Sequence, residues 1–287
     1  MTKQTTPLRQ RMIDDMIIRN MSPSTQKIYI QAVANFARFH RRSPDKLGLE
    51  DVRLFQLHLA TRGLKATTIN PFVGALRFFY RTTLKRDDIA RQIPYSRQED
   101  RLPCVLSHSQ VFQILKAEQN LKYRTAYITI YAAGLRVSEV VKLTPADINS
   151  ERMVIHIQQA KGRKDRYVML PRQLLHILRD YWSQTRPPHW LFPGQDKSRP
   201  ITTRSLQRPF RKVADSIGLD GTVTLHTLRH SFATHLLEQG VDIRVIQQLL
   251  GHRNIVSTSR YAQVALKTIQ KIQSPLEELN LDEIMTS

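Results

Sequence analysis

Apolar residues recur at intervals of three and four through residues 8–90, which is the repeat of α-helices that bury one face. Capping and turn residues divide this stretch into separate helices. Ser-Pro-Ser-Thr at 22–25 and Ser-Pro-Asp at 43–45 place a capping side chain beside a proline, and Thr-Thr at 67–68 provides another start. The pattern predicts a small helical bundle over residues 1–92.

The helical repeat lapses over residues 93–103, where charged residues cluster with two prolines. This composition is typical of an exposed linker and predicts a second domain over residues 104–287. Two short β-branched runs within residues 152–170 flank the turn AKGRKD and predict a β-hairpin. Helical spacing elsewhere in this domain begins at Ser107 and returns at about residues 124–133, 172–183, 203–217, 226–239, 242–250 and 257–270. The predicted fold class is therefore mainly α with a small β-sheet in the second domain.

Positive charge is spread over both predicted domains. The formal net charge is +20, with 18 basic and 9 acidic residues in positions 1–100 and 26 basic and 15 acidic residues beyond them. A polyanion that contacts both domains would explain this balance, because each neutralised phosphate releases counterions and adds affinity. A merely basic, soluble protein is the simpler alternative. The candidate DNA-binding residues are Arg38, Arg41, Arg42, Lys65, Arg77 and Arg81 in the bundle and Arg163, Lys164 and Arg166 in the hairpin.

The bulk composition is that of a globular protein, with 41% hydrophobic and 24% charged residues. A single cysteine, Cys104, excludes an intramolecular disulfide and suits a reducing compartment. The first residues lack the apolar core of a signal peptide, and no apolar run approaches the roughly 20 residues of a membrane span. We therefore expect a soluble, cytoplasmic protein.

The segment AGLRVSE at 133–139 places an arginine at a junction between two helices. Gly134 ends one apolar helix, the next begins at Ser138, and Arg136 lies between them. Glu139, three residues on, can hold the guanidinium of Arg136. A guanidinium fixed in this way suits a phosphate, because its planar fork donates parallel hydrogen bonds. Taken alone, the pair could equally be a surface ion pair.

The segment HTLRH at 226–230 places a titratable imidazole and a permanent cation on one face of a helix. His226 and Arg229 are three residues apart near the start of that helix, where the helix N-terminus also favours an anion. The two side chains could therefore meet a single phosphate. A histidine without a role is the alternative for His226.

Two more candidates carry phosphate chemistry. LLGH ends a helix with glycine, so that His252 leaves the turn in a fixed direction, and Tyr261 follows nine residues later among polar and basic residues. Lys161 lies in the basic hairpin turn, and a lysine near a phosphodiester can protonate a leaving hydroxyl. A packing role for the tyrosine and a solvated turn for the lysine are the alternatives.

Together these segments resemble the tyrosine recombinase/integrase family, and most closely its Xer-type recombinases and short integrases. The family's signatures are similar to AGLRVSE, the hairpin KG-x-K-x-R, HTLRH followed by FATHLL, LLGH and the tyrosine beyond it, which occur here in the family's order. The resemblance spans about residues 104–265, and the start SPSTQKIY is similar to the family's core-binding domain. It implies a two-domain, C-shaped DNA clamp: a helical, SAM-like core-binding domain, then a tyrosine recombinase catalytic domain with a C-terminal tail.

The resemblance also implies roles for the matching residues. Arg136 and Arg229 would clamp the scissile phosphate, and Glu139 would support Arg136.

The resemblance implies a separate role for each of the remaining residues. Tyr261 would attack the phosphate, with His226 as general acid/base near this nucleophile. Lys161 would protonate the 5′-oxygen, and His252 would hydrogen-bond the phosphate.

The reaction implied is site-specific recombination of double-stranded DNA through a covalent 3′-phosphotyrosine and a Holliday junction. It would take place in a tetramer on DNA, either of this chain alone or with a related recombinase. Because the phosphotyrosine keeps the phosphoester energy, we expect neither ATP nor a metal or other cofactor. The sequence agrees, since it holds no G-x-x-x-x-G-K-[ST] loop and no obvious carboxylate cluster.

Three alternatives compete with this interpretation. A topoisomerase of the same chemistry is disfavoured by the small two-domain chain with recombinase spacing. A DNA-binding protein that no longer cuts should have lost a cationic or nucleophilic position, and none is missing. A zinc site built on His226, His230 and His235 is rejected, because His230 and His235 do not share a helical face and no cysteine pair accompanies them.

Overall fold

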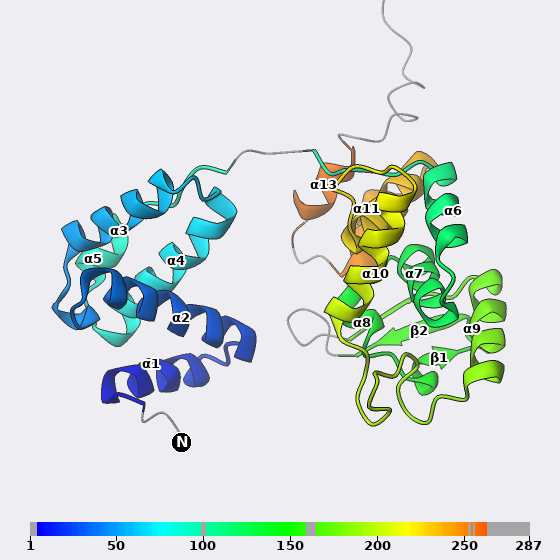
Figure 1. The fold of residues 1–287 in the computed structure, drawn as a ribbon, viewed down its shortest axis with the longest axis horizontal. Coiled ribbons are helices and arrows are strands. Elements are labelled where there is room, and N and C mark those ends of the chain that lie inside the picture. The colour runs from blue at the N-terminus through cyan, green and yellow to red at the C-terminus, as the bar shows by residue number, and fades with distance from the viewer. Residues whose placement is uncertain (1–4, 99–101, 159–164, 252–253, 255, 263–287) are drawn as a thin grey trace, which may run out of the picture. The chain divides into compact units, whose positions relative to one another are not determined.

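The computed structural model describes residues 5–98, 102–158, 165–251, 254 and 256–262. The chain folds into two compact units, each with its own tertiary contacts. The first unit covers Met1–Asp100 and the second Arg101–Ser287 (Figure 1). The predicted fold class is confirmed: helices dominate both units, and the described strands form one small sheet in the second. No helix among the described residues has the length and apolar character that a membrane crossing requires.

The first unit is a helical bundle. Its elements are α1 Pro7–Ile18, α2 Pro23–His40, the 3₁₀ turn η1 Pro44–Lys46, α3 Leu49–Thr61, α4 Ala66–Phe78, the π-helical turn η2 Phe79–Thr83 and α5 Asp87–Gln92. Their apolar faces meet in one core, in which Phe36, Val52 and Leu76 are fully buried. The hydroxyl of buried Tyr80 donates to the carbonyl of Leu47 at 3.0 Å and so stays satisfied in that core.

Local capping residues explain where α2 and α3 begin, whereas α4 begins at Ala66, before the predicted Thr-Thr start, and has no side-chain cap. Ser22 caps α2 as the sequence predicts, accepting the backbone N–H of Thr25 at 3.2 Å. The start expected at residues 43–45 differs: η1 is a single turn, and α3 begins after it. There the carboxylate of Asp51 accepts the N–H of Gly48 at 2.7 Å, which supplies the cap.

The second unit combines packed helices with the small sheet. Its elements are α6 His108–Ala117, α7 Leu121–Ala133, α8 Val137–Val140, η3 Pro145–Asp147, β1 Ile148–Asn149, β2 Val154–Ile157, β3 Arg166–Met169, α9 Arg172–Thr185, α10 Thr203–Ser216, α11 Leu225–Glu238, α12 Ile243–Leu250 and α13 Val256–Ala262. The predicted hairpin is confirmed: β2 and β3 pair antiparallel, with Val154 opposite Met169. The short β1 adds to the β2 edge. Its two residues are too few for an alternating pattern to be seen in the sequence.

Two glycine turns bring distant segments to the buried helix α11. Helix α7 packs against both α9 and α11. Gly134 ends α7 and Gly251 ends α12, both with φ of +61°, the left-handed conformation that glycine adopts most readily. A Cβ at Gly134 would overlap the ring of Phe232 on α11. The chain can therefore pass this close to α11 only with glycine at that position.

Candidate active site

The turn after α7 fixes Arg136 against Glu139. Arg136 is the N-cap of the short helix α8, and Glu139 is its third residue. One carboxylate oxygen of Glu139 accepts the backbone N–H of Arg136 at 2.8 Å, and the other accepts its guanidinium at 2.8 Å. The contact predicted from their spacing is therefore present, and the carboxylate fixes both the backbone and the side chain of Arg136.

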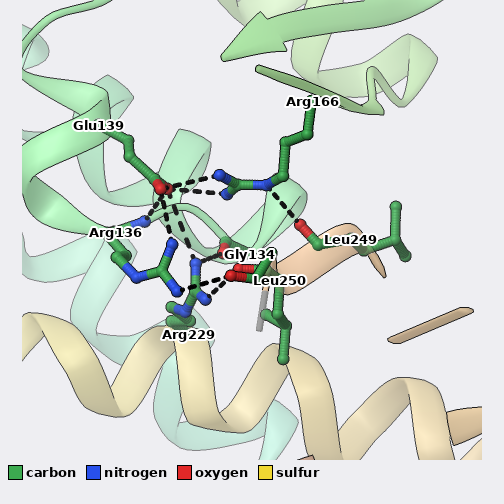
Figure 2. Close-up of polar contacts among 8 residues, drawn as sticks. Gly134, Arg136, Glu139, Arg166, Arg229, Leu249 and Leu250 are labelled. Carbon is green, nitrogen blue, oxygen red and sulfur yellow. Dashed lines mark hydrogen bonds and ion pairs between the residues drawn. The ribbon is translucent and has the colours of Figure 1, made fainter. Parts of the chain in front are cut away.

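Arg229 reaches the same carboxylate from α11. Its side chain is only 2% exposed, and it donates to the carbonyls of Gly134 and Leu250, each at 2.6 Å (Figure 2). Its guanidinium lies 3.7 Å from Glu139. Burial and the positive charge of Arg136 lower the pKa of Arg229 to about 9, which leaves the guanidinium charged at neutral pH. The carbonyl ends of α7 and α12 thus hold a buried cation in place.

A third guanidinium, that of Arg166, completes the cluster (Figure 2). Its two terminal nitrogens donate to the two oxygens of Glu139, both at 2.8 Å, and its Nε donates to the carbonyl of Leu249 at 2.9 Å. Arg166 is predicted from the sequence as a DNA contact, and the structure places its side chain against Glu139 inside the site. The alternation along β3 could have indicated this, because Arg166 shares a face with buried Val168.

Three guanidiniums around one carboxylate strongly favour its ionised form. Burial alone would raise the pKa of Glu139, but the hydrogen bonds and charges of Arg166 and Arg136 outweigh it and lower the pKa to about 2. Glu139 is therefore a carboxylate throughout the physiological range. It offsets part of the positive charge and leaves a net cationic site suited to a phosphate.

A histidine stack connects this cluster to Tyr261. The ring of His226 stacks on that of His230, with centroids 5.6 Å apart, and Nδ1 of His230 lies 3.0 Å from the hydroxyl of Tyr261 on α13. Desolvation of the ring and the positive charges of Arg229 and Arg136 lower the pKa of His226. The family resemblance implies a place near the nucleophile for His226, and in the structure the imidazole that contacts the phenol is that of His230.

Tyr261 is buried in the same unit as Arg229, in an apolar cluster beside α11. The residue is 3% exposed and belongs to a small apolar cluster with Phe232, Ile246 and Leu250. Its phenol lies near enough to Arg229 to affect the pKa of that guanidinium. The candidate nucleophile and the buried cation therefore share one site.

The other predicted site residues divide into two groups. Lys161, Arg163, Lys164 and His252 lie outside the described residues. In the first unit, the exposed candidates are Arg38, Arg41, Arg42, Lys65 and Arg81. Arg77 is partly buried instead, donating to the carbonyl of Ile93 at 3.1 Å and lying over the ring of Tyr95.

Comparisons with known proteins identify integrases and tyrosine recombinases as relatives of this chain. Residues 104–267 match the Phage integrase family, and residues 8–89 match the phage integrase N-terminal SAM-like domain. The chain is 46% identical over 276 residues to a putative integrase/recombinase, y4qK, from Sinorhizobium fredii, covering 96% of this chain and 90% of that protein. It is 32% identical over 261 residues to the tyrosine recombinase XerA of Thermococcus kodakarensis, covering 89% and 90%.

Solved structures share the fold. The Tn1549 transposon integrase in complex with transposon right end DNA superposes with a TM-score of 0.73 at 18% identity, covering 93% of this chain and 99% of that one. The site-specific recombinase XerH bound to its difH substrate superposes with a TM-score of 0.71 at 20% identity, covering 96% and 86%.

Proposed function

The chain belongs to the phage integrase family of tyrosine recombinases, and on that premise we propose that it recombines DNA through a covalent 3′-phosphotyrosine at Tyr261 and a Holliday junction. The observation that carries the proposal is the contact of the Tyr261 hydroxyl with His230 at 3.0 Å, one residue from the buried Arg229. A phenol in a packing role has no need of a guanidinium cluster that is held by a carboxylate and four backbone carbonyls.

The arginines stabilise charge that develops on the scissile phosphate. Arg136 and Arg229 are fixed before DNA arrives, by Glu139 and by the carbonyls of Gly134 and Leu250. Donors that are already oriented need little reorganisation during the reaction, and this is the condition under which they lower a barrier most. Their two guanidiniums would neutralise the non-bridging oxygens while the phenol oxygen of Tyr261 attacks phosphorus in line.

The leaving side of the reaction needs a proton. We assign this to Lys161, which would protonate the 5′-oxygen as its bond to phosphorus breaks, while His252 would hydrogen-bond the phosphate. His226 would act as a general acid/base at the cluster. Because the phosphotyrosine conserves the phosphoester energy, rejoining by a 5′-hydroxyl calls for neither nucleotide hydrolysis nor a metal.

The substrate is double-stranded DNA that carries a recombination site. Exposed basic residues on α2 and around α4, among them Arg38 and Lys65, would bind its phosphates together with Arg163 and Lys164 of the hairpin. Several of the similar structures are complexes with DNA, which supports this part of the proposal. Strand exchange between two duplexes would use a tetramer, either of this chain alone or with a related recombinase.

A covalent-trapping experiment tests the proposal. Purified protein is mixed in EDTA with nicked fragments of the source genome and denatured, and DNA-linked protein is recovered and sequenced. We expect an adduct at Tyr261 on a defined site. Tyr261→Phe should bind the same DNA with unchanged affinity and form no adduct. An adduct on any other residue, or tight DNA binding without an adduct, would contradict the proposed chemistry.

A further inference from the structure

The contact between His230 and Tyr261 involves the atom that would react. Nδ1 of His230 lies 3.0 Å from the phenol oxygen, which is hydrogen-bond distance, and the two rings are inclined by 48° with centroids 5.5 Å apart. The two residues come from different helices, α11 and α13, which pack against each other. The contact is thus formed by tertiary packing rather than by neighbours in the chain.

His230 is held in a fixed orientation within the site. It is one residue beyond Arg229, and its ring stacks on His226 with an interplanar angle of 25°. The ring is partly buried, and on the opposite face of α11 Leu228 is fully buried in the core of the unit. A group in this position can receive a proton from the phenol without moving.

The surroundings of His230 favour its neutral form. Among the described residues, the titratable and charged groups that face it are His226 and Arg229 on α11 and Tyr261 on α13. Burial, together with His226 and Arg229, lowers the pKa of His230 to about 4. At neutral pH the imidazole therefore has one nitrogen without a proton, and a phenol that donates to Nδ1 uses it.

We propose that His230, rather than His226, is the general base that takes the phenol proton of Tyr261 as the phenol oxygen attacks phosphorus, because the contact with the phenol is made by His230. This inference rests on the proposed function. The O–H bond of Tyr261 breaks and its proton passes to Nδ1, the bond between the phenol oxygen and phosphorus forms, and the bond from phosphorus to the 5′-oxygen breaks, with Lys161 supplying the proton to that oxygen. Rejoining reverses each transfer, so His230 returns its proton to the phenol.

We expect DNA binding to raise the basicity of His230. In the free protein Arg229 and His226 disfavour a proton on His230. A phosphodiester bound between the arginines brings a negative charge that offsets these cations and raises the basicity of the imidazole. His230 is thus neutral before DNA arrives and becomes a better proton acceptor once the scissile phosphate is in place.

The test keeps the hydrogen bond and removes only the base. In His230→Asn the amide oxygen can accept from the phenol near the position of Nδ1, but it does not take up a proton. The readout is the rate of adduct formation on the nicked duplex recovered by trapping with the wild-type protein. We expect a loss on the order of 100-fold with natural Tyr261. With 3,5-difluorotyrosine at position 261, whose phenol is more acidic, the loss should become much smaller.

The controls separate this inference from the proposed function. His176→Asn, the same substitution on the exposed face of α9, should react at the wild-type rate. If the wild-type protein forms no adduct, the proposed function and this inference both fail. If the wild-type protein reacts and His230→Asn matches it, or loses the same factor with both phenols, the proposed function stands and the base assignment is overturned.

A second measurement applies even if His230→Asn does not fold. In wild-type protein with ¹⁵N-labelled histidine, the Nδ1 signal of His230 at pH 7 should be that of an unprotonated acceptor. A proton on Nδ1 would leave no acceptor facing the phenol and would overturn the assignment.

Discussion

Glu139 is the residue on which the arginine cluster depends, and Glu139→Gln tests that dependence. Its side chain is 6% exposed and accepts four hydrogen bonds of 2.8 Å, two from Arg136 and two from Arg166. An amide keeps the shape but loses the charge and turns two N–H donors toward guanidiniums that are donors themselves. The substitution therefore leaves buried cations without their counterion, which is the costly way to break a buried ion pair.

The size of the effect follows from the pKa of Glu139. A shift from the ordinary 4.5 to about 2 corresponds to roughly 3 kcal/mol of native-state stabilisation by the ionised carboxylate. Because the folded-state pKa is the lower one, this contribution is complete above about pH 4.5 and is lost as the pH falls toward 2. Glu139→Gln should therefore cost about 3 kcal/mol at pH 7 and about half of that at pH 3.

Tryptophan fluorescence measures the free energy of unfolding of the second unit, which contains Glu139. The protein has two tryptophans, Trp182 and Trp190, and both lie in the second unit, so that their emission reports the unfolding of that unit in the intact chain. Urea titrations of both proteins at pH 7 and pH 3 give the difference in the free energy of unfolding at each pH.

The matched control is Asp215→Asn, which neutralises a carboxylate in an exposed pair with Arg211 in the same unit. It should change the free energy of unfolding by less than about 1 kcal/mol at either pH. A loss below about 1 kcal/mol for Glu139→Gln at pH 7, or an equal loss at both values of pH, would refute the electrostatic account of the cluster.

Two further substitutions test the packing around the site. Gly134→Ala adds a Cβ that overlaps Phe232 at a positive φ, and it should lower the free energy of unfolding in urea. The loss should be well above the roughly 1 kcal/mol expected for the control Gly218→Ala, where φ is +74° and the added Cβ meets nothing within 4 Å. Equal losses for the two variants would contradict the overlap. Ser231→Ala leaves the buried N–H of Leu106 without the hydroxyl that accepts it at 2.9 Å, and should cost about 1–3 kcal/mol by the same measurement, whereas no loss would mean that another acceptor replaces it.

Local features of the site could be predicted because they depend on residues close together in the chain. The pairing of Arg136 with Glu139 follows from their spacing of three residues. The turns at Gly134 and Gly251 follow because helices commonly end at a residue in the left-handed conformation, which glycine adopts most readily. The hairpin follows from two β-branched runs about a turn. Each of these depends on one helical turn or one strand pair, whose periodicity the amino-acid order carries directly.

Contacts between distant elements could not be predicted in the same way. Arg166 looks like one more surface cation of a basic turn until β3 is seen to direct it onto Glu139, 27 residues earlier. The contact of His230 with Tyr261 spans 31 residues and exists only because α11 and α13 pack together. The sequence contains two histidines in one short motif and does not say which one meets the phenol.

The sequence by itself thus determined the helices and hairpin, the basic character of both units, and the kinds of side chain available for phosphate chemistry. These depend on local backbone preferences, on burial periodicity and on charge, all of which are properties of short stretches of chain. Tertiary structure alone decided that three guanidiniums share Glu139 and that His230 faces Tyr261. Those outcomes depend on which helix faces meet, and close packing settles that only when the whole core of the unit has formed.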